Sequence, residues 1–214
     1  SMGGRQPFDS RAEALFAKIG GEQAREVDVM SMARFPQANR ARLVDLSHDV
    51  SPYRVSSGGF VIAQAYRYFP PKTVHLAVVD PGVGSARRPI VMEAAGQYFV
   101  GPDNGIFATV CSREPRHRIR AITAEKYRLP AVSQTFHGRD VFAPAAAHLA
   151  TGVPPSRLGK LIDDYLRPLS EKPVRTARRG WTGAILHVDR FGNLITNFEF
   201  EEFPLVGAGR FEMQ

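Results

Sequence analysis

Short hydrophobic runs separated by turn residues predict a succession of strands. The clearest run, residues 74–79, is almost wholly apolar and stops at Asp80. An apolar run of this length between turn signals is typical of a strand buried on both faces of a parallel sheet. The predicted strands are residues 43–46, 74–79, 90–94 and 98–100, and the last two form a hairpin around Gly96.

Helical spacing or composition marks four further segments. The first follows the candidate N-cap Asp9-Ser10, and the last is rich in alanine and ends at Gly152. Because strands and helices alternate, we expect an α/β fold with a mostly parallel sheet flanked by helices. The predicted helices are residues 12–19, 58–68, 105–111 and 141–150.

The composition changes near residue 168. Residues 1–4 resemble an expression scar, and residues 5–167 are expected to form the α/β N-terminal domain. Residues 168–180 contain prolines and a basic run and are expected to be a linker. Residues 181–214 predict the start of a β-rich C-terminal domain, with strands at 183–188 and 193–200 around a turn. These 34 residues are too few to close a β-rich domain. We therefore expect either that another chain completes its sheet or that the domain has been cut.

Composition narrows the functional classes. The 214 residues are 43% hydrophobic and 23% charged, which is ordinary for a globular protein. No apolar run approaches the roughly 20 residues that a membrane span needs, so no membrane partner is expected. The single cysteine, Cys111, and the lack of a secretory signal favour the cytoplasm.

A net charge of +7 admits an anionic partner. The densest basic groups are Arg113–Arg120, interpreted as a solvated loop, and Arg175–Arg179 beside the linker. Because no aromatic-and-basic binding module accompanies them, nucleic-acid binding is not favoured.

Three clusters carry candidate chemistry, and the first follows the most apolar strand. Asp80 is followed by a loop with glycines at 82 and 84 and then by Arg87. Ligands gather at the carboxyl ends of strands in open α/β sheets. The loop matches neither the GxGxxG fingerprint nor a P-loop, so dinucleotide and ATP sites are not predicted. The alternative is a tight turn with solvated arginines.

The second cluster precedes the alanine-rich helix and centres on His137. His137 and Asp80 are both expected at loops along one edge of the sheet. Alternatively, Thr135 or Asp140 only caps the helix and His137 has no role. A metal site formed by His48, Asp49, His137 and Asp140 is conceivable, but without HxxxH or paired-cysteine spacing none is predicted. No GxSxG elbow indicates a serine hydrolase.

The third cluster lies at the predicted turn of the C-terminal domain. Here an aromatic ring, Phe191, stands between Asp189 and Asn193. An aromatic ring beside an amide can stack on and hydrogen-bond a heteroaromatic base. The alternative is a plain hairpin turn with Gly192 at positive φ.

Five motifs taken together resemble one enzyme family, the S-adenosyl-L-methionine hydroxide adenosyltransferases, hydrolytic relatives of the fluorinase and chlorinase. The resemblance spans about residues 41–198. The motifs, in chain order, are VDLSHDV (44–50), VVDPGVGSARR (78–88), VGPDNGIF (100–107), TFHGRDVFAPAAAHLA (135–150) and DRFGNLITNF (189–198). The family's opening strand, which ends in a Thr-Asp-Phe-Gly-like motif, has no match before Val44.

The resemblance implies hydrolysis of S-adenosylmethionine to adenosine and L-methionine, without metal or cofactor, by a homotrimer with sites between subunits. It assigns the catalytic roles to Asp80, Arg87 and His137. It also assigns substrate contacts: Tyr53 and Phe136 flank the adenosyl group, Asp189 faces the methionine, and Asn193 reads the adenine beside Phe191.

Two alternatives remain open. A halogenase of the same fold would have other residues at the catalytic positions, such as a small or hydroxyl residue in place of His137. The second alternative is a protein that keeps the fold and binds an adenosyl ligand without turnover.

Overall fold

The computed structural model describes residues 15–20, 42–50, 53–167, 172–178, 180–189, 191–199 and 202–203, the first range by its backbone alone. The chain forms two compact units, Ser1–Leu166 and Arg167–Gln214. In the described part of the chain, no helix is long and apolar enough to cross a membrane.

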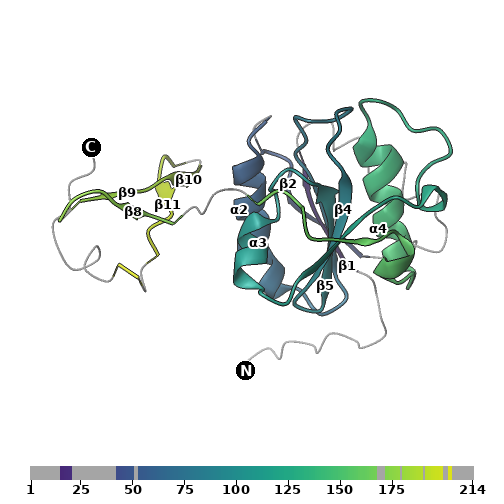
Figure 1. The fold of residues 1–214 in the computed structure, drawn as a ribbon, viewed down its shortest axis with the longest axis horizontal. Helices are drawn as coiled ribbons and strands as arrows, with labels where there is room; N and C mark the ends of the chain where they lie inside the picture. Colours follow the sequence, from purple (N-terminus) through teal and green to yellow (C-terminus); the bar gives the residue numbers. More distant parts are fainter. Residues whose placement is uncertain are drawn as a thin grey trace, which may run out of the picture. The chain divides into compact units, whose positions relative to one another are not determined.

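A seven-stranded sheet forms the centre of the first unit, in the order β2-β1-β3-β5-β4-β6-β7 (Figure 1). Strands β2, β1, β3 and β5 are parallel neighbours, whereas β5, β4, β6 and β7 are antiparallel neighbours. The mixed α/β class is therefore confirmed, with a parallel half and an antiparallel half. The strands are β1 Leu15–Gly20, β2 Arg42–Ser47, β3 Val74–Val78, β4 Pro89–Ala94, β5 Gln97–Pro102, β6 Arg118–Ala121 and β7 Leu161–Ile162.

Helices cover both faces of this sheet, with α2 and α3 on one side and α4 on the other (Figure 1). The first hydrophobic core includes Ile62, Phe99 and Val110, and the second includes Leu76 and Phe142. Successive residues of β3 enter opposite cores because side chains alternate across a strand. The helices are α2 Val55–Ala65, continued by the 3-10 turn Tyr66–Tyr68, α3 Ala108–Arg113, and α4 Ala143–Ala150.

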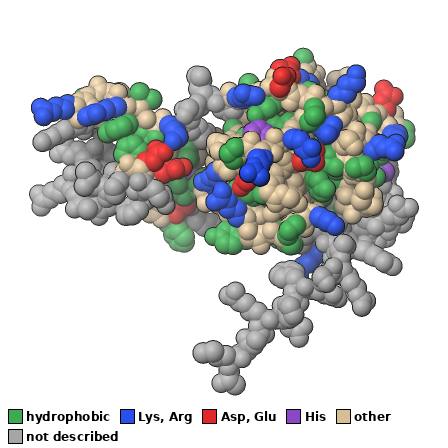
Figure 2. Space-filling model, turned by 60° about the horizontal axis from the view of Figure 1, so that its bottom comes forward, with side chains coloured by type: hydrophobic (Ala, Val, Ile, Leu, Met, Phe, Trp, Pro, Cys, Tyr) green, Lys and Arg blue, Asp and Glu red, His purple; other side chains and the backbone are tan. Residues whose placement is uncertain are grey.

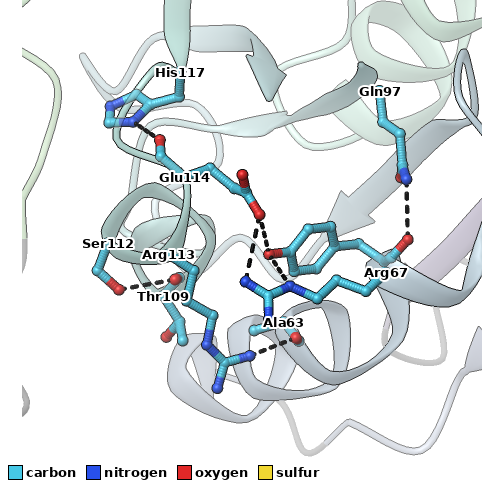
Figure 3. Close-up of polar contacts among 9 residues, drawn as sticks. Ala63, Arg67, Gln97, Thr109, Ser112, Arg113, Glu114 and His117 are labelled. Atoms are coloured by element: carbon cyan, nitrogen blue, oxygen red, sulfur yellow. Dashed lines mark hydrogen bonds and ion pairs between the residues drawn. The ribbon is translucent and has the colours of Figure 1, made fainter. Parts of the chain in front are cut away.

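Polar contacts join the ends of α2 and α3 (Figure 3). The Tyr66 hydroxyl, wholly buried, donates to Oε1 of Glu114 at 2.6 Å and accepts a hydrogen bond from Nε of Arg67 at 2.8 Å. Nη1 of Arg113 donates to the carbonyl of Ala63 at 2.6 Å. The two helices are thus fixed to each other through hydrogen bonds as well as through the apolar core.

Several local predictions agree with the structure. The segment predicted as helix 58–68 is α2 with its 3-10 extension, and the predicted hairpin is β4–β5. The hairpin turn residues Ala95 and Gly96 have φ of 51° and 71°. Both residues of a type I′ turn require positive φ, which matches the twist of the flanking strands.

The helix predicted over residues 12–19 is wrong from Leu15 onward, and its proposed cap lies outside the described residues. Residues 15–20 are strand β1, which pairs in parallel with both β2 and β3. A helix of two turns is marginal by itself, whereas a central strand has hydrogen-bonding neighbours on both edges. Tertiary pairing has therefore overridden the local helical spacing.

The solvated loop predicted over Arg113–Arg120 is also wrong. The chain forms helix α3 to Arg113 and enters strand β6 at Arg118. In β6 the arginines alternate with inward residues such as Ile119, which is 2% exposed. The period-2 pattern of Arg-Ile-Arg-Ala was the signal for this strand, and the high charge obscured it.

The second unit contains two short hairpins. Strand β8 (Val174–Arg175) pairs with β9 (Trp181–Thr182), and β10 (Ile185–Val188) pairs with β11 (Leu194–Thr196), both antiparallel. β8 lies within the stretch predicted as a linker. The strands predicted at 183–188 and 193–200 correspond to β10 and β11 but are shorter in the structure.

A wholly buried histidine lies in the middle of the sheet. His75 of β3 is 0% exposed, stacks on the Phe99 ring with centroids 4.6 Å apart, and donates through Nε2 to Oε1 of Gln97. The Gln97 amide donates in turn to the carbonyls of Tyr66 and Phe69 at 3.1 and 3.0 Å. Burial lowers the pKa of His75 from 6.5 to about 4.

This histidine predicts a loss of stability in acid. In the unfolded chain His75 takes up a proton near pH 6.5, whereas in the folded protein it stays neutral down to about pH 4. The stability of the folded state that depends on neutral His75 is therefore complete above pH 6.5 and is lost as the pH falls from 6.5 to about 4. We expect His75 to contribute about 3 kcal/mol to the fall in unfolding free energy over that window. Urea unfolding at several pH values measures it. His75→Gln must show a shallower pH dependence, and an unchanged slope would contradict the assignment.

Candidate active site

The chain leaves strand β3 into a tight loop that returns toward the strand end. The carbonyl of Asp80 accepts the amide of Val83 at 3.2 Å, and the Gly82 carbonyl accepts both the amide and the hydroxyl of Ser85, at 3.0 and 2.6 Å. Ser85 Oγ also accepts the amide of Arg87 at 3.3 Å. These turns bring the side chain of Arg87 back onto Asp80.

Asp80 and Arg87 form a buried two-pronged ion pair. Nε of Arg87 donates to Oδ1 of Asp80 at 2.9 Å and Nη2 donates to Oδ2, and the two side chains are only 8% (Arg87) and 6% (Asp80) exposed. Arg87 Cζ also lies 5.1 Å from the ring centre of Phe142. Nη1 of Arg87 is buried and has no hydrogen-bond partner among the described residues. Buried donors are almost always satisfied, so this N–H group is available to a ligand.

His137 completes a chain of three side chains. Its Nδ1 lies 2.8 Å from Nη2 of Arg87. A guanidinium only donates, so Nδ1 must be the acceptor and the proton of the neutral ring must sit on Nε2. Burial, and next the positive charge of Arg87, lower the pKa of His137 below 6.5. His137 is therefore neutral at pH 7 and offers an N–H donor at Nε2.

His137 immediately precedes a π-helical turn, Gly138–Phe142, that leads into α4. Neither Thr135 nor Asp140 caps this helix, because no side chain of the described residues forms a capping hydrogen bond at its N-terminus. The capping alternative is thus wrong. Asp140 instead bonds residues of the loop before it. A π-turn inside a helix is rare and frequent at functional sites.

The conceivable metal site is not assembled. Within the described ranges, no three His, Cys, Asp or Glu side chains are grouped closely enough to hold a metal ion. Nε2 of His48 lies 3.3 Å from Oδ1 of Asp45, and both oxygens of Asp140 accept hydrogen bonds from protein donors.

The two aromatic candidates of the first unit are at the surface. Tyr53 is 78% exposed and has a φ of 66°, a left-handed conformation that is uncommon outside glycine. Phe136 is 43% exposed and lies under the guanidinium of Arg139, with Cζ 5.0 Å from the ring centre. Aromatic rings exposed at the surface are available to stack on a ligand.

The three candidates of the second unit share one turn. Oδ1 of Asp189 accepts the amides of Phe191 and Asn193, both at 2.8 Å, and Oδ2 accepts Nδ2 of Asn193 at 2.6 Å. These hydrogen bonds, first those from Asn193, lower the pKa of Asp189. Gly192 has a φ of 84°, as the hairpin alternative expects, and the Phe191 ring is 87% exposed.

Sequence reasoning gave no role to Asn104. This residue follows β5, and its Nδ2 donates to the carbonyl of Val79 at 2.8 Å. It thereby fixes the backbone just before Asp80. The available signal was its position in a polar turn directly after a buried strand, at the same edge as Asp80.

Several arginines of the first unit form ion pairs with carboxylates. Figure 2 shows separate groups of basic side chains interspersed with neutral and acidic ones on the face in view. Glu93 contacts both Arg118 and Arg120, and Asp103 contacts Arg88. This pairing reduces the unbalanced positive charge available to a nucleic acid.

Comparison with known proteins gives consistent matches. Residues 21–159 match the model of the SAM hydroxide adenosyltransferase N-terminal domain. A protein of Salinispora tropica named (R)-S-adenosyl-L-methionine hydrolase is 44% identical over 155 residues, 72% of this chain and 59% of its own length. One of the same name from Methanocaldococcus jannaschii is 40% identical over 163 residues, 76% of this chain and 56% of its own length.

A solved structure of an uncharacterized conserved protein from Thermotoga maritima has a TM-score of 0.79 and 36% identity, covering 90% of this chain and 74% of that one. The chain spans less than two thirds of the length of the two named relatives. The family model alone covers well over half of the chain. On this evidence the chain belongs to the SAM hydroxide adenosyltransferase family.

Proposed function

We propose that this protein hydrolyses S-adenosyl-L-methionine to adenosine and L-methionine, with Asp80, Arg87 and His137 at the reacting centre. The observation that carries the proposal is the hydrogen-bonded chain Asp80–Arg87–His137. In it Asp80 and Arg87 are buried, and Nη1 of Arg87 has no hydrogen-bond partner among the described residues. The names of relatives 40% and 44% identical support the same reaction.

The chemistry suits these residues. Hydrolysis forms a bond between the nucleophile's oxygen and C5′ and breaks the bond from C5′ to sulfur, whose electron pair stays on the departing thioether. The leaving group is neutral, so it needs neither a general acid nor a Lewis acid, and no metal or cofactor is required. What the protein must supply is an oriented nucleophile with stabilised negative charge.

Arg87 and His137 supply hydrogen-bond donors for that charge. Nη1 of Arg87 and Nε2 of His137 have no hydrogen-bond partner among the described residues, so both can donate to a ligand. Both oxygens of Asp80 accept hydrogen bonds from Arg87, so the role of Asp80 is to hold the guanidinium in place. The nucleophile therefore acts as hydroxide, its proton lost to solvent, and attacks in line with the departing sulfur.

The remaining candidates bind the substrate. Tyr53 and Phe136 flank the adenosyl group with exposed rings. Asp189 faces the methionine part, and Asn193 reads the adenine edge beside Phe191. The protein acts as a cytoplasmic homotrimer whose sites lie between subunits, and its single cysteine suits a reducing compartment.

Binding of an adenosyl ligand without turnover is the alternative function. Binding of S-adenosylmethionine without release of adenosine distinguishes this candidate. A halogenase is less favoured, because the resemblance gives the halide-using relatives other residues at the positions of Asp80, Arg87 and His137.

Removing Arg87 tests the catalytic proposal. We expect Arg87→Ala to lower kcat roughly 100- to 1,000-fold, the usual effect of deleting one electrostatic donor to a transition state, with a much smaller change in substrate affinity. Chromatography of adenosine and methionine gives the rate, and calorimetry gives the affinity. Arg118→Ala, an exposed arginine of β6, is the control. Loss of affinity at unchanged turnover would assign Arg87 to substrate binding instead.

The neutral state of His137 predicts an acid limb in the pH profile. Protonation places a cation against Arg87 and removes the acceptor at Nδ1, so kcat must fall as pH drops through a pKa below 6.5. In His137→Asn, which does not titrate, the inflection due to His137 must disappear from the residual activity, leaving only the dependence on hydroxide formation. Initial rates between pH 4.5 and 9 measure it, and a wild-type midpoint above 6.5 would refute the arrangement.

A further inference from the structure

Asp140 is a buried carboxylate without an assigned role. It lies in the π-helical turn, is 0% exposed, and has both oxygens occupied. Oδ2 accepts the backbone amide of Ser133 at 2.8 Å, and Arg139 donates to Oδ1 at 2.6 Å and to Oδ2 at 3.1 Å. Burying a charge is costly unless it is paired and hydrogen-bonded, so these contacts define one position for this side chain.

The backbone of Asp140 makes two further hydrogen bonds to the loop before it, residues 129–140. Its carbonyl accepts the amide of Leu129 at 2.8 Å, and its amide donates to the carbonyl of Phe136 at 3.0 Å. The segment that leads to His137 is therefore hydrogen-bonded to Asp140 at three points: its beginning at Leu129, its middle at Ser133 and its end at Phe136.

This loop contacts the other catalytic loop directly. A Cβ placed on Gly84 would lie 2.8 Å from the carbonyl oxygen of Gln134, and Gly84 has a φ of 76°. The loop that carries Asp80 and Arg87 therefore touches the backbone next to Ser133. Only a glycine permits so close an approach in this conformation.

We propose that Asp140 is a positioning residue for the hydrolysis: its carboxylate holds the loop 129–140 so that Nδ1 of His137 meets Arg87. The expected effect on kcat rests on the proposed function, whereas the expected effect on the position of His137 does not. Asp140 acts through His137 and contacts no reacting atom.

Kinetics separate this role from general stabilisation. Misplacing a reacting group by about 1 Å costs up to ~100-fold in rate, so Asp140→Asn should lower kcat about 10- to 100-fold with little change in KM. In a His137→Ala background the same substitution should cause almost no further loss, because residues that act as a unit are not additive. Glu93→Gln, which also removes a carboxylate paired with arginines, should leave kcat unchanged. An equal loss in both backgrounds would overturn the proposal.

The ionisation of His137 gives a readout that does not require turnover. The charged groups acting on this ring are Arg87, Asp80, Asp140 and Arg128. Loss of the Asp140 charge alone would lower the His137 pKa further, whereas release of the ring from Arg87 raises it toward 6.5. NMR titration of the full chain should therefore show a higher His137 pKa in Asp140→Asn. A lower or unchanged value, with the fold intact by circular dichroism, would overturn the positioning role whether or not the wild type hydrolyses its substrate.

Should Asp140→Asn fail to fold, a matched pair at Ser133 keeps the inference testable. Ser133→Pro removes the amide that Asp140 accepts, and Ser133→Ala retains it, while both lose the hydroxyl contact to the amide of Thr135 at 3.2 Å. The proline variant alone should raise the His137 pKa. Identical titration of the two variants would contradict the role of the carboxylate.

Discussion

The ion pair between Asp80 and Arg87 is the interaction on which the site depends. Both side chains are more than nine-tenths buried, so removing either leaves a buried charge without its partner, at a typical cost of 3–5 kcal/mol. The pair fixes the plane of the guanidinium by two parallel hydrogen bonds. With the plane fixed, Nη2 of Arg87 faces His137, and Nη1 has no hydrogen-bond partner among the described residues.

The orientation of Arg87 also decides the state of His137. Because a guanidinium has no acceptor, the histidine facing it stays neutral and turns its proton outward. Asp80 and Asp140 favour the protonated ring, but burial and Arg87 outweigh them. The result is two N–H donors without partners among the described residues, held beside a neutralised ion pair. This arrangement is suited to stabilising a small negative charge rather than to taking up a proton.

The fold brings the components together by two different routes. Asp80 and Asn104 follow parallel strands β3 and β5, so both lie at the carboxyl edge of the sheet by topology alone. His137 is placed differently, because fifteen residues lie between it and the end of β6 at Ala121. Hydrogen bonds centred on Asp140, rather than a strand, determine where this histidine lies.

The sequence by itself determined the α/β class, the buried strand before Asp80, the hairpin at Gly96 and the candidates Asp80, Arg87 and His137. These features depend on local hydrophobic period, turn chemistry and short motifs, which a single chain displays. The interpretation of residues 15–19 as helix and of residues 118–120 as loop was wrong. Strand pairing with distant segments outweighed helical spacing in the first, and a high charge obscured the alternation in the second. Only the tertiary structure decided that Arg87 stands between Asp80 and His137, which tautomer His137 adopts, and that Asp140 holds a loop instead of capping a helix. These three features depend on side chains of residues 7 to 50 positions apart in the sequence meeting within hydrogen-bond distance. No local sequence pattern encodes such a meeting.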